Sequence, residues 1–256
     1  MKNLSTVGSI FYGLAIASMG LQAIYSGRFP YMLIPPTHFS PPVLAILAYI
    51  TGTVCVLSGV CITFNKMGRF ASLLLGCLLS LIFCFGFIPY EVIANPNYLQ
   101  FGEWENAEKE LALSAGAFVI AGSFSGENKN SGLLTKLIPF GAIVFALTML
   151  CFGIDHFLEP KGVAEYMPGW IPYPIFWAYF CGIALIGAGV AIILKIKTSL
   201  FATLLGIMIF SWFIILHIPK VIVAPSLPEM RGELTSAFLA LAYSGIAFVI
   251  AGIAKK

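Results

Sequence analysis

The sequence has few charged residues. Only 10% of its 256 residues are Asp, Glu, Lys or Arg, whereas 59% are apolar. A soluble domain carries roughly 25% charged and 45–50% apolar residues. This balance excludes an ordinary soluble domain and indicates an integral membrane protein, with the lipid bilayer as its first partner. The net charge of +3, without a basic arm or tail, gives no reason to expect nucleic-acid binding.

The sequence also lacks the motifs that identify common enzymes. It contains no phosphate-binding loop and no nucleophile elbow. Its only histidines are His38, His156 and His217, and their spacing is not that of metal ligands, so no metal site is predicted. The six cysteines lie inside apolar runs and form no CxxC motif, which favours small buried side chains. No motif identifies a reaction, so enzymatic activity is left open.

Eight apolar runs are long enough to be membrane spans. They cover about 6–26, 42–64, 69–89, 108–124, 135–157, 173–194, 198–218 and 234–254. In lipid each must be a helix, because the backbone donors and acceptors have no water to bond. The sequence therefore predicts an all-α, multi-pass membrane protein with eight transmembrane helices. Pro89 and Pro219 are expected to end or kink their spans.

The Lys and Arg residues predict the orientation. One face of the predicted bundle holds both termini and the short loops; its basic residues are Lys2, Lys66, Arg69, Lys129, Lys136, Lys195, Lys197, Lys255 and Lys256. The other face holds Arg28, Lys109, Lys161, Lys220 and Arg231, together with every acid except Glu127. An excess of Lys and Arg marks the cytoplasmic side. Both termini are therefore predicted to be cytoplasmic.

The chain contains an internal similarity. Residues 111–122 read LALSAGAFVIAG and residues 241–252 read LAYSGIAFVIAG, so nine of twelve positions match at an offset of 130. The same offset pairs Gly102-Glu103 with Gly232-Glu233 and Ile88-Pro89 with Ile218-Pro219. We predict two four-helix repeats, 1–126 and 127–256. Because four is even, both repeats enter from the same side, which makes them parallel rather than inverted.

A segment in the second half resembles a known family. Its residues are Gly153, His156, Phe157, Pro160, Tyr166, Met167, Pro168 and Pro172, and they are similar to the pattern of the DoxX-like membrane proteins. The resemblance implies four-helix units in the bacterial cytoplasmic (inner) membrane, a link to redox or sulfur metabolism, and a redox partner protein. The chain departs from the family pattern in having no acid in the second span of either repeat, and Gln22-Ala23 where the second half has Asp155-His156.

Helix geometry places one group of polar residues at a common depth. His156 follows Lys136 by twenty residues, and His217 follows Lys197 by twenty. At 1.5 Å per residue, both lie roughly 30 Å from the cytoplasmic side, about one hydrocarbon thickness. The predicted ligand-binding residues at this outer level are Asp155, His156, His217, Lys220 and Arg231. The alternative interpretation is that they are interfacial anchors.

These residues lead to a functional prediction. An imidazole there would transfer protons or bond a carbonyl, and a quinone head group or small sulfur oxyanion would fit. We predict an accessory or anchor subunit for membrane redox chemistry, with quinone as the possible cofactor. The alternative is a non-enzymatic transporter of a small solute or a membrane scaffold. Glu103 and Glu233 are interpreted as acids near helix N-termini. Glu103, Glu105, Glu108 and Glu110 are expected to form a solvated entrance.

Overall fold

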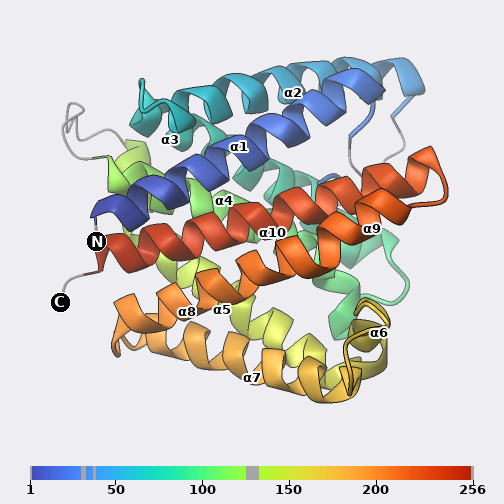
Figure 1. The fold of residues 1–256 in the computed structure, drawn as a ribbon. Coiled ribbons are helices and arrows are strands. Elements are labelled where there is room, and N and C mark those ends of the chain that lie inside the picture. Colours follow the sequence, from blue (N-terminus) through green and yellow to red (C-terminus); the bar gives the residue numbers. More distant parts are fainter. Residues whose placement is uncertain (1, 30–32, 37–38, 125–132, 255–256) are drawn as a thin grey trace.

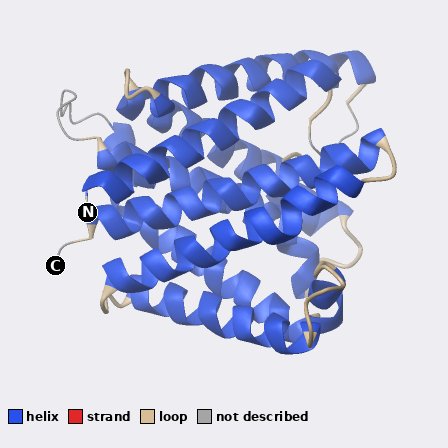
Figure 2. Cartoon of the chain, viewed as in Figure 1, coloured by secondary structure: helices blue, strands red, loops and turns tan. Residues whose placement is uncertain are grey.

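The computed structural model describes residues 2–29, 33–36, 39–124 and 133–254. Within these ranges the chain is helical and contains no strand (Figure 2). In chain order the elements are α1 (Lys2–Ser26), α2 (Pro41–Thr63), α3 (Gly68–Ile82), η1 (Phe83–Phe87), η2 (Tyr90–Ala94), η3 (Phe101–Trp104), α4 (Glu105–Ser123), η4 (Leu133–Leu137), α5 (Ile138–Leu158), α6 (Pro160–Glu165), α7 (Pro174–Ile193), α8 (Thr198–Trp212), η5 (Phe213–His217), α9 (Ile218–Val223) and α10 (Leu227–Ile253). The all-α prediction is confirmed over this part of the chain.

Seven helices among the described residues are long and apolar enough to cross a membrane. They run Asn3–Ser26, Pro41–Thr63, Gly68–Ala94, Leu133–Leu158, Pro174–Ile193, Thr198–Val223 and Leu227–Ile253. The remaining predicted run, 108–124, forms α4, whose first two turns carry Glu105, Glu108, Lys109 and Glu110. Because α4 has only 19 residues, no stretch of 18 residues within it avoids these charges, whereas α10, with 27 residues, continues well beyond Glu229, Arg231 and Glu233. The structure is therefore that of a helical membrane protein.

Each half of the chain has a helix that packs against a helix of the other half. Helix α1 packs along both α2 and α10, while α5 packs along both α7 and α4. The first helix of each half thus lies against the last helix of the other, and α4 also contacts α10 (Figure 1). Helices α4 and α10 consequently carry the most continuous buried stretches, because every residue from Ala112 to Ala121 and from Ala242 to Ala251 is buried.

Glycines allow α1 and α10 to approach closely. A Cβ at Gly8 would lie 2.4 Å from the Gly245 carbonyl oxygen, and one at Gly245 would lie 2.5 Å from the Gly8 carbonyl oxygen. Such distances are below van der Waals contact, so neither position accepts a side chain without the helices moving apart. Small residues at helix contacts are the usual means of tight packing in membranes. Gly187, on the outside of α7, has nothing within 4 Å of its Cβ position.

A π turn precedes proline in two spans. The Ile88 N–H donates to Phe83 O and the Ile218 N–H donates to Phe213 O, each reaching back five residues. Proline lacks an N–H and its ring clashes with the carbonyl four residues back, and a wider turn relieves that clash. Helical structure continues beyond Pro89 and Pro219. Of the two expected effects, the ending of the spans is therefore wrong, and a kink at either proline stays a prediction.

The turns after α2 and α7 have the same backbone. Asn65 and Met67 have φ of 53° and 55°, and Lys195 and Lys197 have φ of 57° and 42°. Their hydrogen bonds also correspond: Phe64 to Val60, Asn65 to Ile62 and Lys66 to Cys61 in one turn, and Leu194 to Val190, Lys195 to Ile192 and Ile196 to Ala191 in the other. Each pair of positions is 130 residues apart.

In each half, a serine hydroxyl forms a hydrogen bond between two helices. Ser114 Oγ donates to Gly76 O at 3.0 Å, and Ser244 Oγ donates to Gly206 O at 2.9 Å. Both glycines also face an aromatic ring, Phe118 and Phe248 respectively. In the first half, Ser114 additionally shares a hydrogen bond of 2.7 Å with Ser80 Oγ.

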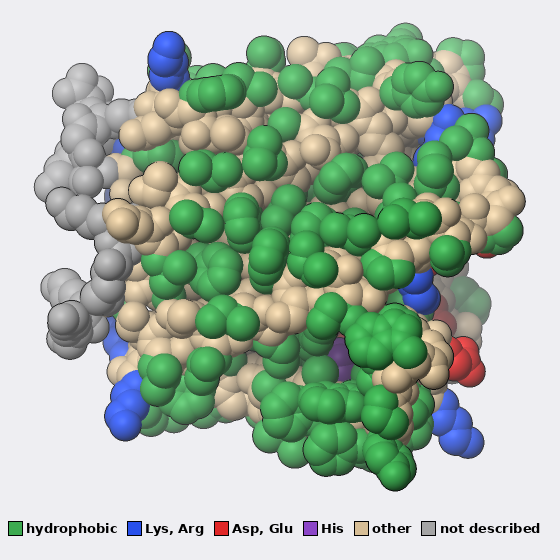
Figure 3. Space-filling view, in the orientation of Figure 1, with side chains coloured by type: hydrophobic (Ala, Val, Ile, Leu, Met, Phe, Trp, Pro, Cys, Tyr) green, Lys and Arg blue, Asp and Glu red, His purple; other side chains and the backbone are tan. Residues whose placement is uncertain are grey.

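The bundle has two polar ends and an apolar middle. On the face shown in Figure 3, charged side chains lie at the two ends and apolar side chains cover the region between them. Both chain termini lie at one end (Figure 1), here called the terminal end; the opposite end, which holds the connections after α1, η2, α5 and α9, is called the loop end. Of the residues used to predict orientation, Lys129, Lys255, Lys256 and Glu127 lie outside the described residues, as does the side chain of Lys2.

The cysteines differ in their surroundings. All six have free thiols, but only Cys55 and Cys181 are buried, and Cys84 is exposed on the helix surface. The expectation that all six are buried is wrong for Cys84, because its side chain lies on the outward face of π turn η1. An apolar environment for such a residue comes from lipid rather than from protein.

Candidate functional site

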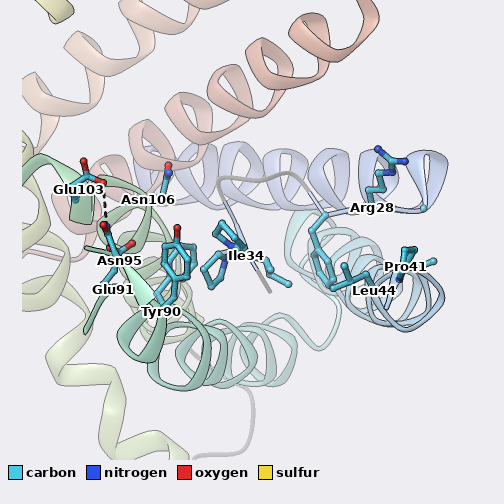
Figure 4. A pocket seen from close by; sticks show the side chains of 15 residues that line it. Arg28, Ile34, Pro41, Leu44, Tyr90, Glu91, Asn95, Glu103 and Asn106 are labelled. Atoms are coloured by element: carbon cyan, nitrogen blue, oxygen red, sulfur yellow. Dashed lines mark hydrogen bonds between the residues drawn. The ribbon is translucent and has the colours of Figure 1, made fainter. Parts of the chain in front are cut away.

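A cleft opens at the loop end of the first half. It has a volume of about 690 Å³ and lies between the segment after α1, the start of α2, the η1–η2 region and the start of α4. Its apolar lining includes Ile34, Pro35, Pro36, Pro41, Leu44 and Phe87, and its polar lining Arg28, Tyr90, Glu91, Asn95, Glu103 and Asn106. Arg28 lies at the opposite end of the cleft from the Glu91, Asn95 and Glu103 group (Figure 4). This volume is typical of small-molecule sites.

The acidic end of the cleft is held by one asparagine. Asn95 Nδ2 donates to Glu91 Oε2 at 2.6 Å and to Glu103 Oε2 at 3.2 Å. Glu91 is 3% exposed and Asn95 is 8% exposed, whereas Glu103 is exposed, so the group extends from the protein interior to the surface. Asn95 directly follows η2, and its own N–H donates to Tyr90 O at 2.9 Å. The end of the π turn thus fixes the amide that joins the two carboxyl groups.

A second, much smaller cavity lies deeper in the first half. It has a volume of about 20 Å³ and is lined mainly by apolar residues of α1, α2 and α3, among them Met19, Cys55 and Leu79. The acid in its wall is Glu110, which is 0% exposed and has no hydrogen-bond partner for either carboxyl oxygen. Phe29 lines both this cavity and the larger cleft.

The predicted ligand residues of the second half are all half-buried at the loop end. His156 Nδ1 lies 2.7 Å from Phe152 O, and its ring stacks on Trp212 with centroids 6.1 Å apart. Lys220 Nζ lies 3.5 Å from the centroid of the Tyr166 ring, a cation–π contact. One oxygen of Asp155 and Nδ1 of His217 are buried without a hydrogen-bond partner among the described residues.

Lys109 of α4 lies between several of these groups. It is within Coulombic range of both Asp155 and His217, and it pairs with Glu105 at 2.8 Å. We define the Lys109 cluster as Glu105, Glu108, Lys109, Asp155, His156 and His217. Glu108 belongs to the cluster because it interacts electrostatically with Asp155 and with the Cys151 thiol. His156 belongs to it because it interacts electrostatically with Glu105. Lys220 adjoins the cluster through His217.

Arg231 stands apart from the other predicted residues. Its backbone carbonyl accepts hydrogen bonds from Gln22 Nε2 at 2.7 Å and from Thr235 Oγ1 at 3.0 Å. Among the described residues, no hydrogen bond or ion pair joins its guanidinium to the Lys109 cluster. Its contacts instead join the start of α10 to the end of α1.

The acids of α4 do not form the solvated entrance that the sequence suggested. Glu103 and Glu105 are exposed, but Glu110 is fully buried and one oxygen of Glu108 is buried without a partner. Glu233 also differs from its prediction: α10 begins at Leu227, so Glu233 lies in the second turn and not at the N-terminus. The missed signal is spacing, since Glu110 is three residues after Ala107 and four before Ser114, both on the buried face.

No family model matches the chain, and neither a curated protein nor a solved structure matches it. Within the described residues, no group of three or more His, Cys, Asp or Glu side chains is arranged to hold a metal ion. The resemblance to the DoxX-like proteins stays a prediction. The two polar regions relevant to function are the cleft of the first half and the Lys109 cluster.

Proposed function

We propose that the protein is a DoxX-like protein of the bacterial cytoplasmic membrane that binds a small amphiphilic molecule in the loop-end cleft of its first half. In this role it is an accessory or anchor subunit for membrane redox chemistry, working with a redox partner protein. The observation that carries the proposal is the cleft of about 690 Å³ with its Glu91–Asn95–Glu103 group, in which the buried Glu91 and Asn95 join the exposed Glu103.

The proposal includes eight spans arranged as two parallel repeats, 1–126 and 127–256. Its support comes from features that recur 130 residues apart: the two left-handed turns, the two π turns and the two serine–glycine contacts. The reciprocal packing of α1 on α10 and of α5 on α4 is the pattern expected of two similar units. Helix α4 is then the eighth span; in its charged first turns Glu110 is buried, Glu108 and Lys109 are half-buried and Glu105 is exposed at the loop end.

The proposed orientation places the loop end outside the cell. Its support is the distribution of basic residues, because Lys66, Arg69, Lys136, Lys195 and Lys197 are all at the terminal end. An excess of Lys and Arg in short loops is typical of the cytoplasmic side. The cleft would then open to the periplasmic side, where a ligand from the outer leaflet or the aqueous phase reaches it.

The charges of the cleft select the ligand. Asn95 uses its Nδ2 to bridge two carboxyl groups, so the remaining carboxyl oxygens at this end accept hydrogen bonds. They favour a head group with hydroxyl or ammonium donors and disfavour a sulfur oxyanion, which like charge repels. The prolines, Leu44 and Phe87 provide an apolar wall for the body of the molecule. A quinol, the reduced and hydroxylated form of a quinone, has this combination.

Transport of a small solute is the second candidate function. The observation that favours it is the position of the half-buried Glu108 and the fully buried Glu110 within α4, since ionisable groups inside a membrane bundle are costly and mark pathways. The cleft itself ends near Phe87 and Asn106, at the loop end. Binding in the cleft is therefore the function that the geometry supports best.

The experiment compares gently purified proteins by native mass spectrometry and solvent extraction after incubation with a short-chain quinol. The variant E91Q/E103Q keeps the shape of the acidic end and removes both carboxylates. Because a hydrogen bond to a charged group contributes about 1.5–3 kcal/mol, we expect its affinity to fall at least about tenfold. The control E165Q removes an exposed acid in α6 at the same end and should bind as the wild type does.

The double variant H156A/H217A tests the rival site. Loss of the quinol in this variant alone would move binding to the Lys109 cluster and contradict the cleft. Equal binding in all four proteins would show that neither site holds the quinol. A partner protein retained in all four, with no bound small molecule, would favour the scaffold alternative.

A further inference from the structure

We propose that Glu110 is the inner end of a polar half-path through which its carboxyl group exchanges a proton with water at the loop end only. This inference does not depend on the ligand of the cleft. It rests on the burial of Glu110, on the cavity beside it, and on the arrangement of polar side chains along α4.

Glu110 is an unpartnered acid in a place that is costly for one. It is 0% exposed, both its carboxyl oxygens lack a hydrogen-bond partner, and it faces a cavity of about 20 Å³. A cavity needs roughly 10–15 Å³ to hold a water molecule, so this one accommodates a single water. Ionisable groups kept inside a membrane bundle mark pathways for protons or ions more often than structural contacts.

Polar side chains connect this position to the loop end. Glu103, Asn106 and Glu110 are spaced by three and four residues, so they lie along one face at the start of α4. Glu103 and Asn106 line the cleft, and Glu110 lines the inner cavity. Phe29 belongs to the walls of both, so its ring is the barrier between them. Four residues of helix, about 6 Å, separate Asn106 of the cleft from Glu110.

The path stops on the other side of Glu110. One turn further along α4, Ser114 is already bonded to Gly76 O and Ser80 Oγ. The buried residues from Ala115 to Ala121 are all Ala, Gly, Phe, Val or Ile and offer no polar side chain. About 20 Å of helix remain between Glu110 and the end of α4. A proton that reaches Glu110 from the loop end therefore has no route to the terminal end along this face.

The titratable groups that face Glu110 come from three helices. They are Tyr12 of α1, Cys55 of α2 and Tyr243 of α10. The two tyrosine hydroxyls donate to Leu113 O at 2.8 Å and to Lys109 O at 2.9 Å, so they hold α4 in place rather than bonding Glu110. Helix α3 contributes Leu79 and Ile82, and the segment after α1 contributes Phe29 and Leu33. No described cation lines the cavity.

The chemical step is a proton transfer. A hydronium ion in the cleft gives its proton, through the water in the small cavity, to a carboxylate oxygen of Glu110, leaving water and a carboxylic acid. No carbon bond changes and no electron moves. The reverse step returns the proton to the cleft. The ligand of this site is therefore the proton itself.

Infrared difference spectroscopy tests this exchange directly. The protein is reconstituted in sealed vesicles with the loop end outward, and the external pH is changed while no cleft ligand is present. The exposed acids of the loop end also respond to external pH, so the test follows the difference between spectra: we expect one carboxyl band that responds to external pH in the wild type and in the control E108Q and is absent from E110Q. Changing only the internal pH should leave this band unchanged.

Two variants keep Glu110 and alter the route. N106L removes the polar side chain between the cleft and the cavity, and F29W enlarges the shared wall, so both should slow the response to external pH. Glu110 bands that ignore external pH, or that follow internal pH, would overturn the proposal. So would an unchanged rate in both N106L and F29W. Because no quinol is used, failure here is distinct from failure of the ligand proposal.

Discussion

The loop ends of the two halves have a similar scaffold and different polar content. Positions 130 residues apart share turns, π turns and serine–glycine contacts, yet Glu91 corresponds to Val221 and Glu110 to Ala240. In the other direction, Phe87 corresponds to His217 and Tyr90 to Lys220. The first half therefore has an open, acidic cleft, whereas the second has histidines and a lysine in contact with aromatic rings.

The difference shows where each kind of feature resides. The shared features lie inside the bundle, where a glycine or a serine bond determines how closely two helices pack. Most of the differing residues, such as Glu91 and Tyr90, lie in the last turns at the loop end, whereas Glu110 lies deeper, inside the bundle. His156 on Trp212 and Lys220 on Tyr166 occupy space in the second half that the first half leaves as a cleft.

Adding a buried acid to the second half, or removing the one in the first half, should have the largest effect on stability. A240E places a carboxyl group at a position that is 6% exposed, and we expect a loss of roughly 3 kcal/mol, the cost of an ionisable group inside a membrane helix. E110L removes a carboxyl that has no partner and should raise stability by about 1–3 kcal/mol. Denaturant unfolding in one detergent measures both. Equal stability of the two variants would contradict the distinction between the halves.

Adding a methyl group at the contact between α1 and α10 should have an intermediate effect on stability. G245A places a methyl group 2.5 Å from the Gly8 carbonyl oxygen, so α1 and α10 must separate, at a cost of about 1–3 kcal/mol. The matched control G187A meets nothing within 4 Å and should be neutral or slightly stabilising, since alanine favours helix. The midpoint of thermal unfolding distinguishes them. A loss in G187A as large as in G245A would show that the contact is not the cause.

Removing the serine of each half should have the smallest effect. S244A loses one hydrogen bond, to Gly206 O, and we expect about 0.6 kcal/mol, the average for such bonds within membranes. S114A loses the bond to Gly76 O and also leaves Ser80 without its partner, so about 1 kcal/mol is expected. The same unfolding measurement compares them. A larger loss in S244A would reverse this order and contradict the assignment of the extra bond.

The sequence predicted the helices well because their lengths are set by the membrane. The run 173–194 became α7, Pro174–Ile193, and the run 42–64 became α2, Pro41–Thr63, because apolar length alone determines both. Helix α10 is longer than its run by seven residues at the start, since Ser226 caps a polar turn there. Local polarity could not reveal that this turn continues the helix.

The candidate sites were harder to predict because they depend on helix rotation. Nothing local distinguishes Glu105, which is exposed, from Glu110, which is fully buried. The difference arises because α4 is surrounded by α3, α5 and α10. The cleft was also missed, since its lining comes from two parts of the chain, 27–45 and 87–106, that are more than 40 residues apart. The depth of a residue along a span can be counted from the sequence. The direction in which its side chain points is set by the helices packed against that span.

The π turns change the apolar periodicity of the two spans that contain them. A turn closed by a bond to the fifth residue back contains one residue more than an α turn, which rotates everything beyond it by about 100°. Residues on either side of 83–87, or of 213–217, therefore belong to two helical phases. Apolar periodicity summed across such a span blurs the direction in which its outer end points. Deleting a single residue within 83–87 would bring the phases together and rotate the outer end of that span, Glu91 and Asn95 included, relative to the rest of the bundle.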